Sequence, residues 1–277
     1  WTDFNNDKWP DLIVVGDWMA IHIFKNEKGR LVRWSDHSLA ETDGLWKRVV
    51  PIDIDQDGDM DYVVGNAGEN LPWTPSSQNP VQIRIADFNT DGRIDPVFTQ
   101  FEKGREIPMA SRDELLNQLP LLKKTFTSYR KYAEASLPDL INKTSLLHAK
   151  TLTLKKISSA ILLNLGKAGF KLSDLPISAQ FSSAYGLLVY DFNRDGWQDV
   201  LVGGNFRDYK TNFGPNDASM GTVLLNDRKG GFLSQNKLRF GKILNGEVRH
   251  LEKLGTANQS YLLIVGSNQA VRLAKIM

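Results

Sequence analysis

Residues 191–204 read DFNRDGWQDVLVGG, an acidic loop that runs directly into an apolar, β-branched segment. Three further segments align with it without gaps: DFNNDKWPDLIVVG from Asp3, DIDQDGDMDYVVGN from Asp53 and DFNTDGRIDPVFTQ from Asp87. They share the pattern D-x-D/N-x-D-G-x-x-D followed by a strand, with lysine replacing glycine in the first copy. Four copies of one loop–strand unit predict a repeat protein.

The oxygen-rich side chains of each loop suit a calcium ion. Ca²⁺ takes about six to eight oxygen ligands from carboxylates, amides, backbone carbonyls and water. Oxygens at loop positions 1, 3, 5 and 9 converge if the chain curls around the ion, and glycine at position 6 permits the sharp turn. The predicted ligands are Asp3, Asn5, Asp7 and Asp11; Asp53, Asp55, Asp57, Asp59 and Asp61; Asp87, Asn89, Asp91, Arg93 and Asp95; Asp191, Asn193, Asp195, Trp197 and Asp199.

Among these residues, Asp59, Arg93 and Trp197 occupy position 7 and would contribute a backbone carbonyl. Lys8 stands where the other loops have glycine, so we expect three to four bound Ca²⁺ ions. An EF-hand is excluded, because its loop needs a glutamate at position 12 and flanking helices. A role as simple turns accounts for one Asp-Gly cluster better than for four matched copies.

Hairpin patterns accompany the loops. Residues 20–34, 159–173 and 221–235 each read as two apolar strands around a polar, glycine-containing turn. Residues 246–268 repeat the strand–loop–strand pattern without the acidic ligands. Repeated antiparallel units of this size are typical of a β-propeller.

The loops and strands resemble the FG-GAP or VCBS repeats of integrin-type propellers. Stretches such as LPISAQFSSAYGLLVYDFNRDG and GEVRHLEKL resemble bacterial secreted proteins related to cartilage acidic protein, which are often joined to an ASPIC/UnbV module. This resemblance implies an all-β fold, a calcium-stabilised β-propeller with about five FG-GAP/VCBS-type repeats and an α-helical insertion in one blade. Residues 1–277 would form a single propeller domain or a propeller fragment, located in a secreted, periplasmic or cell-surface protein. The resemblance implies no shared biochemical activity.

The helical insertion is expected at residues 111–147. Ser111 and Glu114 form a capping-box pattern, so a helix should begin near Arg112, and Pro120 should divide or kink it. We expect this insertion in the third unit, between the strand that ends near Phe101 and the hairpin at 159–173. It would then emerge opposite the calcium loops. Its basic residues predict a solvated face, or a surface for an anionic partner.

Other chemistry finds little support in the sequence. With no cysteine, disulfides and zinc–thiolate sites are excluded, and no apolar run is long enough to span a membrane. The four histidines are scattered, and no nucleophile elbow, phosphate loop or dinucleotide fingerprint is present. The basic residues are not interleaved with an aromatic platform, so we expect no nucleic-acid binding.

Loops on a rigid scaffold commonly carry recognition. The segments opposite the calcium loops contain the candidate ligand-binding residues Trp73, Asn205, Arg207 and Tyr209. The favoured hypothesis is a non-enzymatic, calcium-stabilised extracellular module that binds protein or glycan. The alternative is a glycan-active enzyme such as a polysaccharide lyase, in which Arg207 and Asp208 would supply the cation and the base.

Overall fold

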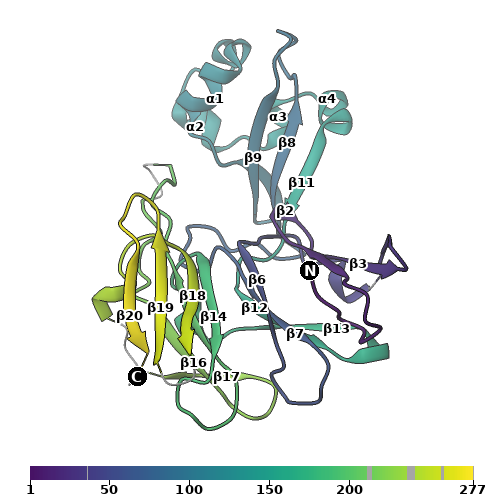
Figure 1. The fold of residues 1–277 in the computed structure, drawn as a ribbon. Coiled ribbons are helices and arrows are strands. Elements are labelled where there is room, and N and C mark those ends of the chain that lie inside the picture. The colour runs from purple at the N-terminus through teal and green to yellow at the C-terminus, as the bar shows by residue number, and fades with distance from the viewer. Residues whose placement is uncertain (36, 211–213, 236–240, 257–258, 277) are drawn as a thin grey trace. The chain divides into compact units, whose positions relative to one another are not determined.

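The computed structural model describes residues 1–35, 37–210, 214–235, 241–256 and 259–276, and these are mostly β-strand (Figure 1). The chain separates into two compact units. The main unit contains Trp1–Thr74 and Ile157–Met277, and the inserted unit contains Pro75–Lys156. Among the described residues, no helix has the length and apolar character needed to cross a membrane.

Successive antiparallel sheets form the main unit, with strand orders β1-β3-β4, β6-β7-β12-β13, β14-β15-β16-β17 and β18-β19-β20, plus the pair β2-β5. The strands of the first sheet and of the pair are β1 (Leu12–Val14), β2 (Asp17–Met19), β3 (His22–Glu27), β4 (Arg30–Arg33) and β5 (Gly44–Leu45). Those of the second sheet are β6 (Arg48–Ile52), β7 (Asp61–Gly65), β12 (Ala160–Asn164) and β13 (Phe170–Asp174). The third and last sheets contain β14 (Ala184–Tyr190), β15 (Asp199–Gly204), β16 (Thr222–Asn226), β17 (Phe232–Gln235), β18 (Val248–Thr256), β19 (Gln259–Gly266) and β20 (Arg272–Ile276). Short 3-10 turns lie at η1 (His37–Leu39), η3 (Gly166–Ala168), η4 (Ile177–Ala179) and η5 (Gly241–Leu244).

Apolar layers between consecutive sheets hold the main unit together. In β7, Val64 belongs to the layer shared with the first sheet, and Val63 to the layer shared with the third. In β15, Val200 faces the second sheet, while Leu201 packs with the last sheet. Neighbouring strand residues point to opposite faces, so a sheet buried on both sides reads as a continuous apolar run. A closed ring of sheets is not found in the part of the chain that the structure describes.

The hairpin of β12 and β13 corrects one expectation. We expected residues 159–173 to complete the unit of the third acidic loop. Instead, β12 pairs with β7, with Ala160 opposite Val64 and Leu162 opposite Tyr62, and so completes the sheet of the second loop. The inserted unit therefore interrupts the second sheet between its second and third strands.

The inserted unit has its own sheet, in the order β10-β9-β8-β11, and the third acidic loop joins β8 to β9. Its strands are β8 (Val81–Ala86), β9 (Asp95–Glu102), β10 (Arg105–Pro108) and β11 (Lys150–Leu154). Short helices between β10 and β11 surround one end of this sheet: α1 (Arg112–Gln118), η2 (Pro120–Lys124), α2 (Tyr129–Ala133), α3 (Leu137–Leu140) and α4 (Lys143–His148) (Figure 1).

The start of the first helix is confirmed, but its location is not. Ser111 and Glu114 form the reciprocal capping box, α1 begins at Arg112, and the new turn η2 begins at Pro120. However, the carbonyl of Gln118 at the end of α1 accepts a hydrogen bond from Asn89 of the third acidic loop (3.3 Å). The helices therefore lie beside this loop, not opposite it. The unforeseen strand β10 explains the difference, because it returns the chain to the loop end before the helices begin.

Apolar residues recur at steps of three and four at Leu115, Leu119, Leu122, Phe126, Tyr129 and Ala133, which predicts one apolar stripe along the helices. This stripe is only partly present. Leu115, Leu119 and Phe126 are buried in the core of the inserted unit, as expected. Tyr129 is 65% exposed, and Tyr132 packs on this core instead. The interruption between η2 and α2 resets the helical phase, so a spacing counted across it selects the wrong face.

Candidate metal centre

All four acidic loops have the same backbone conformation. Position 4 has a positive φ in each, with values of 56°, 59°, 60° and 61° at Asn6, Gln56, Thr90 and Arg194. Position 6 is also left-handed, at 69° in Lys8 and 84–90° in Gly58, Gly92 and Gly196. Lys8 therefore adopts the turn that glycine provides elsewhere, although a Cβ makes that conformation less favourable. The first loop keeps the shape of the others.

The aspartate at position 9 closes each loop. Asp11, Asp61, Asp95 and Asp199 are 0–5% exposed. Each accepts a hydrogen bond from the backbone N–H of position 2, at 2.9–3.2 Å. Sequence reasoning treated these residues only as metal ligands, whereas the structure gives them a second task in holding the loop.

In the first, third and fourth loops, the remaining oxygens accept hydrogen bonds from the loop itself. The position 1 carboxylates of Asp3, Asp87 and Asp191 accept from the N–H groups of positions 5 and 6, at 2.7–3.1 Å. At position 3, the amide oxygens of Asn5, Asn89 and Asn193 accept from position 5, and at position 5 Asp7, Asp91 and Asp195 accept from position 7. The position 7 residues Arg93 and Trp197 thus donate their backbone N–H groups to the position 5 carboxylates.

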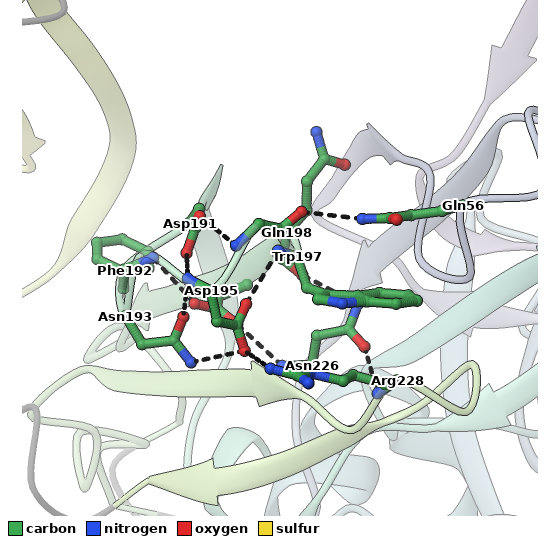
Figure 2. Close-up of polar contacts among 11 residues, drawn as sticks. Gln56, Asp191, Phe192, Asn193, Asp195, Trp197, Gln198, Asn226 and Arg228 are labelled. Carbon is green, nitrogen blue, oxygen red and sulfur yellow. Dashed lines mark hydrogen bonds and ion pairs between the residues drawn. The ribbon is translucent and has the colours of Figure 1, made fainter.

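The fourth loop adds an ion pair to this arrangement. The Arg228 guanidinium, from the hairpin after β16, contacts Asp195 Oδ2 at 2.8 Å (Figure 2). This hydrogen bond holds the pKa of Asp195 below its usual value. A bound cation would have to share Asp195 with Arg228, which distinguishes this loop from the second.

The second loop has the geometry of a metal site. Ligand oxygens of Asp53, Asp55 and Asp61 lie within 4.8 Å of one another, the one such group of titratable ligands found in the described part of the chain. Asp53 Oδ1 is buried and has no hydrogen-bond partner among the described residues. An unpaired buried carboxylate oxygen is unfavourable unless a cation or water satisfies it. These residues therefore fit a hard, oxygen-preferring divalent cation such as Ca²⁺. Asp57 is not part of this group, and its Oδ1 accepts from the N–H of Asp59 (2.8 Å).

The electrostatics of the second loop also favour a cation. Burial raises the pKa of Asp61 to about 6, and hydrogen bonds from Asn164 and Ile54 oppose this only in part. Burial, followed by the neighbouring Asp57, raises the pKa of Asp55. Both carboxylates are thus disfavoured as anions in the absence of a counter-charge.

A buried asparagine at the end of the third strand was missed by the sequence reasoning. Asn26, Asn164 and Asn226 each donate their backbone N–H to the position 9 aspartate of their own sheet, at 2.7–2.9 Å. The amide of Asn164 also donates to the carbonyl of Phe4, and that of Asn226 to the carbonyl of Ile54, both at 2.8 Å. These bonds tie the first acidic loop to the second sheet and the second acidic loop to the third sheet. The shared letters at the start of the hairpin turns, FKN, LLN and LLN, were the available signal.

Neighbouring loops also contact each other directly. Asn6 and Gln56, both at position 4, donate to the position 6 carbonyls of Gly58 (3.4 Å) and Gly196 (2.9 Å). Figure 2 shows Gln56 beside the fourth loop. The first, second and fourth loops thus form one continuous row at one end of the main unit.

The opposite end of these strands carries aromatic side chains. Trp73 and Tyr209 meet edge to face with ring centroids 6.3 Å apart, and Tyr209 contacts Phe206 at 4.8 Å. The Arg249 guanidinium lies 4.2 Å from the ring centroid of Tyr185, which contacts Phe206 in turn. We call these five residues the aromatic cluster. All are half-buried or close to the surface, and all belong to the main unit.

The other two candidate ligand residues are engaged within the chain. Asn205 is 1% exposed, and its amide nitrogen donates to the carbonyls of Ser219 and Gly246, each at 2.9 Å. The exposed Arg207 donates through Nε to Asp217 (3.1 Å). The structure therefore joins Trp73 to Tyr209, and it gives Asn205 a structural role.

Comparison with known proteins agrees with the repeat. Residues 3–64 match the family of the FG-GAP-like repeat. The matched region covers the first two acidic loops and ends within β7. No curated protein matches the chain significantly.

Proposed function

We propose that this protein is a calcium-stabilised, non-enzymatic recognition module that binds a protein or a glycan outside the cytoplasm. Its scaffold would be a β-propeller of FG-GAP/VCBS-type blades, of the kind found in secreted, periplasmic or cell-surface proteins related to cartilage acidic protein. The FG-GAP-like repeat at residues 3–64 supports the scaffold. The stacked sheets of the main unit, of which the first three each carry an acidic loop, support it further.

One observation carries the proposal: within the main unit, the acidic loops and the aromatic cluster lie at opposite ends of the strands. Position 9 begins β7 in the second loop and β15 in the fourth, and it directly precedes β1 in the first. Phe206 follows the other end of β15. The loops can therefore bind cations and stiffen the sheets while the far end remains available. Aromatic side chains that present both an apolar face and a polar edge are common at recognition surfaces.

For the metal, Asp53, Asp55 and Asp61 would hold Ca²⁺ in the second loop. A bound Ca²⁺ would supply positive charge to these carboxylates and link the start of β7 to the loop. The other loops have the same backbone, so three to four sites remain our expectation. Scanning calorimetry with calcium or with a chelator tests this role. An unchanged melting temperature would contradict it.

The lyase alternative gains no support from the geometry, because Arg207 already pairs with Asp217. For the recognition role, a glycan array and a protein pull-down should compare the wild type with Trp73→Ala and Tyr209→Ala. Tyr129→Ala serves as a matched control, since Tyr129 is an exposed aromatic residue in the inserted unit. We expect the first two variants to lose binding and the control to keep it. Equal binding by all four proteins would remove the aromatic cluster from the function.

A further inference from the structure

The first sheet of the main unit contains a cleft that neither the acidic loops nor the aromatic cluster uses. Its volume is about 570 Å³, and it is formed by β2, the start of β3, the end of β4 and the turn η1. Because the acidic loop enters this sheet at the start of β1, the cleft lies at the opposite end of the strands. Two tryptophans, two histidines, one arginine and one aspartate are among its lining residues: Trp18, Trp34, His22, His37, Arg33 and Asp43.

Trp18 occupies an unusual backbone position in this cleft. Its φ is +59°, and it is the extra residue of a bulge in β2, between the pairs Asp17–Leu45 and Met19–Gly44. Trp18 follows Asp11 at the same interval at which Gly68, also left-handed, follows Asp61. A bulky residue is strained where glycine would be relaxed, and such strain and such bulges are frequent at functional sites. The indole ring therefore stands at a position whose backbone conformation favours glycine.

Trp34 is the second aromatic side chain of the cleft lining. Its Nε1 is buried and lacks a hydrogen-bond partner among the described residues. Buried donors are nearly always satisfied, by protein, by water or by a bound molecule. Its ring is held in place by Phe4, edge to face, at a centroid distance of 5.5 Å. Because Nε1 is closed to solvent, Trp34 contributes its ring to the lining of the cleft.

The polar groups of the cleft point to the chemistry of the ligand. Arg33 Nη2 lies 3.0 Å from His22 Nδ1. Because arginine stays protonated, His22 must accept at Nδ1 and carry its proton on Nε2. Burial, together with the Arg33 charge, lowers the pKa of His22 and so favours this neutral form. The bond uses one of the five N–H donors of the guanidinium, which suits bidentate binding of a carboxylate.

We propose that this cleft binds an acidic sugar residue of a glycan, with the pyranose ring on Trp18 and its carboxylate on Arg33. His22 Nε2–H and the Asp43 carboxylate would serve the hydroxyl groups as donor and acceptor. A pocket with large aromatic walls and a few placed polar groups is typical of small-ligand recognition. The inference deepens the proposed recognition function and rests on it. It selects glycan as the ligand class and assigns a site separate from the aromatic cluster.

Isothermal titration calorimetry on the full chain in calcium buffer tests this proposal. The probes are trigalacturonate and a hyaluronan tetrasaccharide, with galactotriose and fully N-acetylated chitotetraose as their neutral counterparts. We expect at least one acidic probe to bind at least tenfold more tightly than its neutral counterpart, with a change in tryptophan fluorescence. Equal affinity for the acidic and neutral probes, or no binding of any of them, would overturn the proposal.

Variants separate the cleft from general effects on folding. Arg33→Gln should lower the affinity for the acidic probe at least tenfold and leave the affinity for the neutral probe unchanged. Trp18→Asn should weaken both probes without lowering the melting temperature, because asparagine tolerates the left-handed conformation. Trp1→Ala is the control, since Trp1 is 77% exposed and lies outside the cleft.

The outcomes also distinguish this proposal from the broader function. If ligands from the array bind through Trp73 and Tyr209 but Trp18→Asn and Arg33→Gln change nothing, the cleft assignment is wrong and the recognition function stands. If a protein partner is captured and no glycan binds, the glycan assignment is wrong. If the array, the pull-down and the calorimetry all show no binding, both proposals fail.

Discussion

Replacing Asp61 with asparagine separates the structural task of this carboxylate from its proposed task in binding metal. Asp61 is 2% exposed and accepts hydrogen bonds from the backbone N–H groups of Ile54 (3.1 Å) and Asn164 (2.7 Å). Asparagine keeps one acceptor oxygen and replaces the other with a donor. One buried N–H group therefore loses its partner, at a cost of about 1–3 kcal/mol.

An opposing effect acts in the metal-free protein. Burial raises the pKa of Asp61 from 3.8 to about 6. At about 1.4 kcal/mol per pH unit, keeping the carboxylate ionised at pH 7 costs the folded state roughly 3 kcal/mol. Asparagine removes this cost. The variant without metal should therefore be as stable as the wild type, or up to about 2 kcal/mol more stable.

Calcium should reverse the order of the two proteins. A ligand present at a hundredfold excess over its Kd stabilises the native state by about 2.7 kcal/mol. The wild type gains this at the second loop, whereas the variant lacks one of the ligands Asp53, Asp55 and Asp61. The difference between the proteins should thus shift by roughly 2–3 kcal/mol against the variant when calcium is added.

Urea denaturation at pH 7, with millimolar calcium or with a chelator, measures this shift. Asp227→Asn is the matched control, because Asp227 accepts backbone N–H groups of a hairpin turn outside the acidic loops. Its effect should be the same in both buffers. If Asp61→Asn also changes stability equally in both buffers, Asp61 has no role in metal binding and the assignment of this site is wrong.

Four further predictions follow from the same loops. The pKa of Asp61 is higher in the folded than in the unfolded protein, so in the presence of a chelator the protein should be more stable at pH 5 than at pH 7. Asp61→Asn should remove the part of this pH dependence that comes from Asp61. Lys8→Gly should raise the melting temperature, because it relieves a left-handed lysine at φ 69° that costs about 1 kcal/mol; an unchanged or lower value would contradict this. Asn226→Ala should lower the free energy of unfolding in urea by about 2–4 kcal/mol. The side-chain amide of Asn226 donates hydrogen bonds to the carbonyls of Ile54 and Gln198 and accepts one from the N–H of Arg228, and the variant loses all three. Asp57→Ala should lower the calcium stoichiometry by one, measured by metal analysis of purified protein, if Asp57 moves into the coordination shell when calcium binds; an unchanged count would exclude it as a ligand.

Local features of this protein could be predicted from the sequence because neighbouring residues determine them. The four acidic loops share one backbone since each places its oxygens and its left-handed residues at the same intervals. The helix beginning at Arg112 was predictable for a similar reason, because a capping box needs only Ser111 and Glu114. The candidate metal residues also came from the sequence, although the closing role of the position 9 aspartates did not.

Strand pairing was decided by the tertiary structure. Residues 160–174 form the expected hairpin, but its partner β7 lies almost a hundred residues earlier, and the intervening unit has a sheet of its own. An apolar strand buried on both faces fits several neighbours equally well by composition. The choice depends on side-chain packing and on hydrogen bonds such as that from Asn164 to Asp61.

Tertiary packing also decided where the candidate ligand sites lie. The sequence placed Trp73 and Tyr209 at one end of the strands, and only the folded chain brought their rings together. The cleft around Trp18 and Trp34 left no motif, because its lining comes from a bulge, two strand ends and a turn. Local hydrogen-bond geometry is specified by adjacent residues, whereas a cavity depends on how distant surfaces pack.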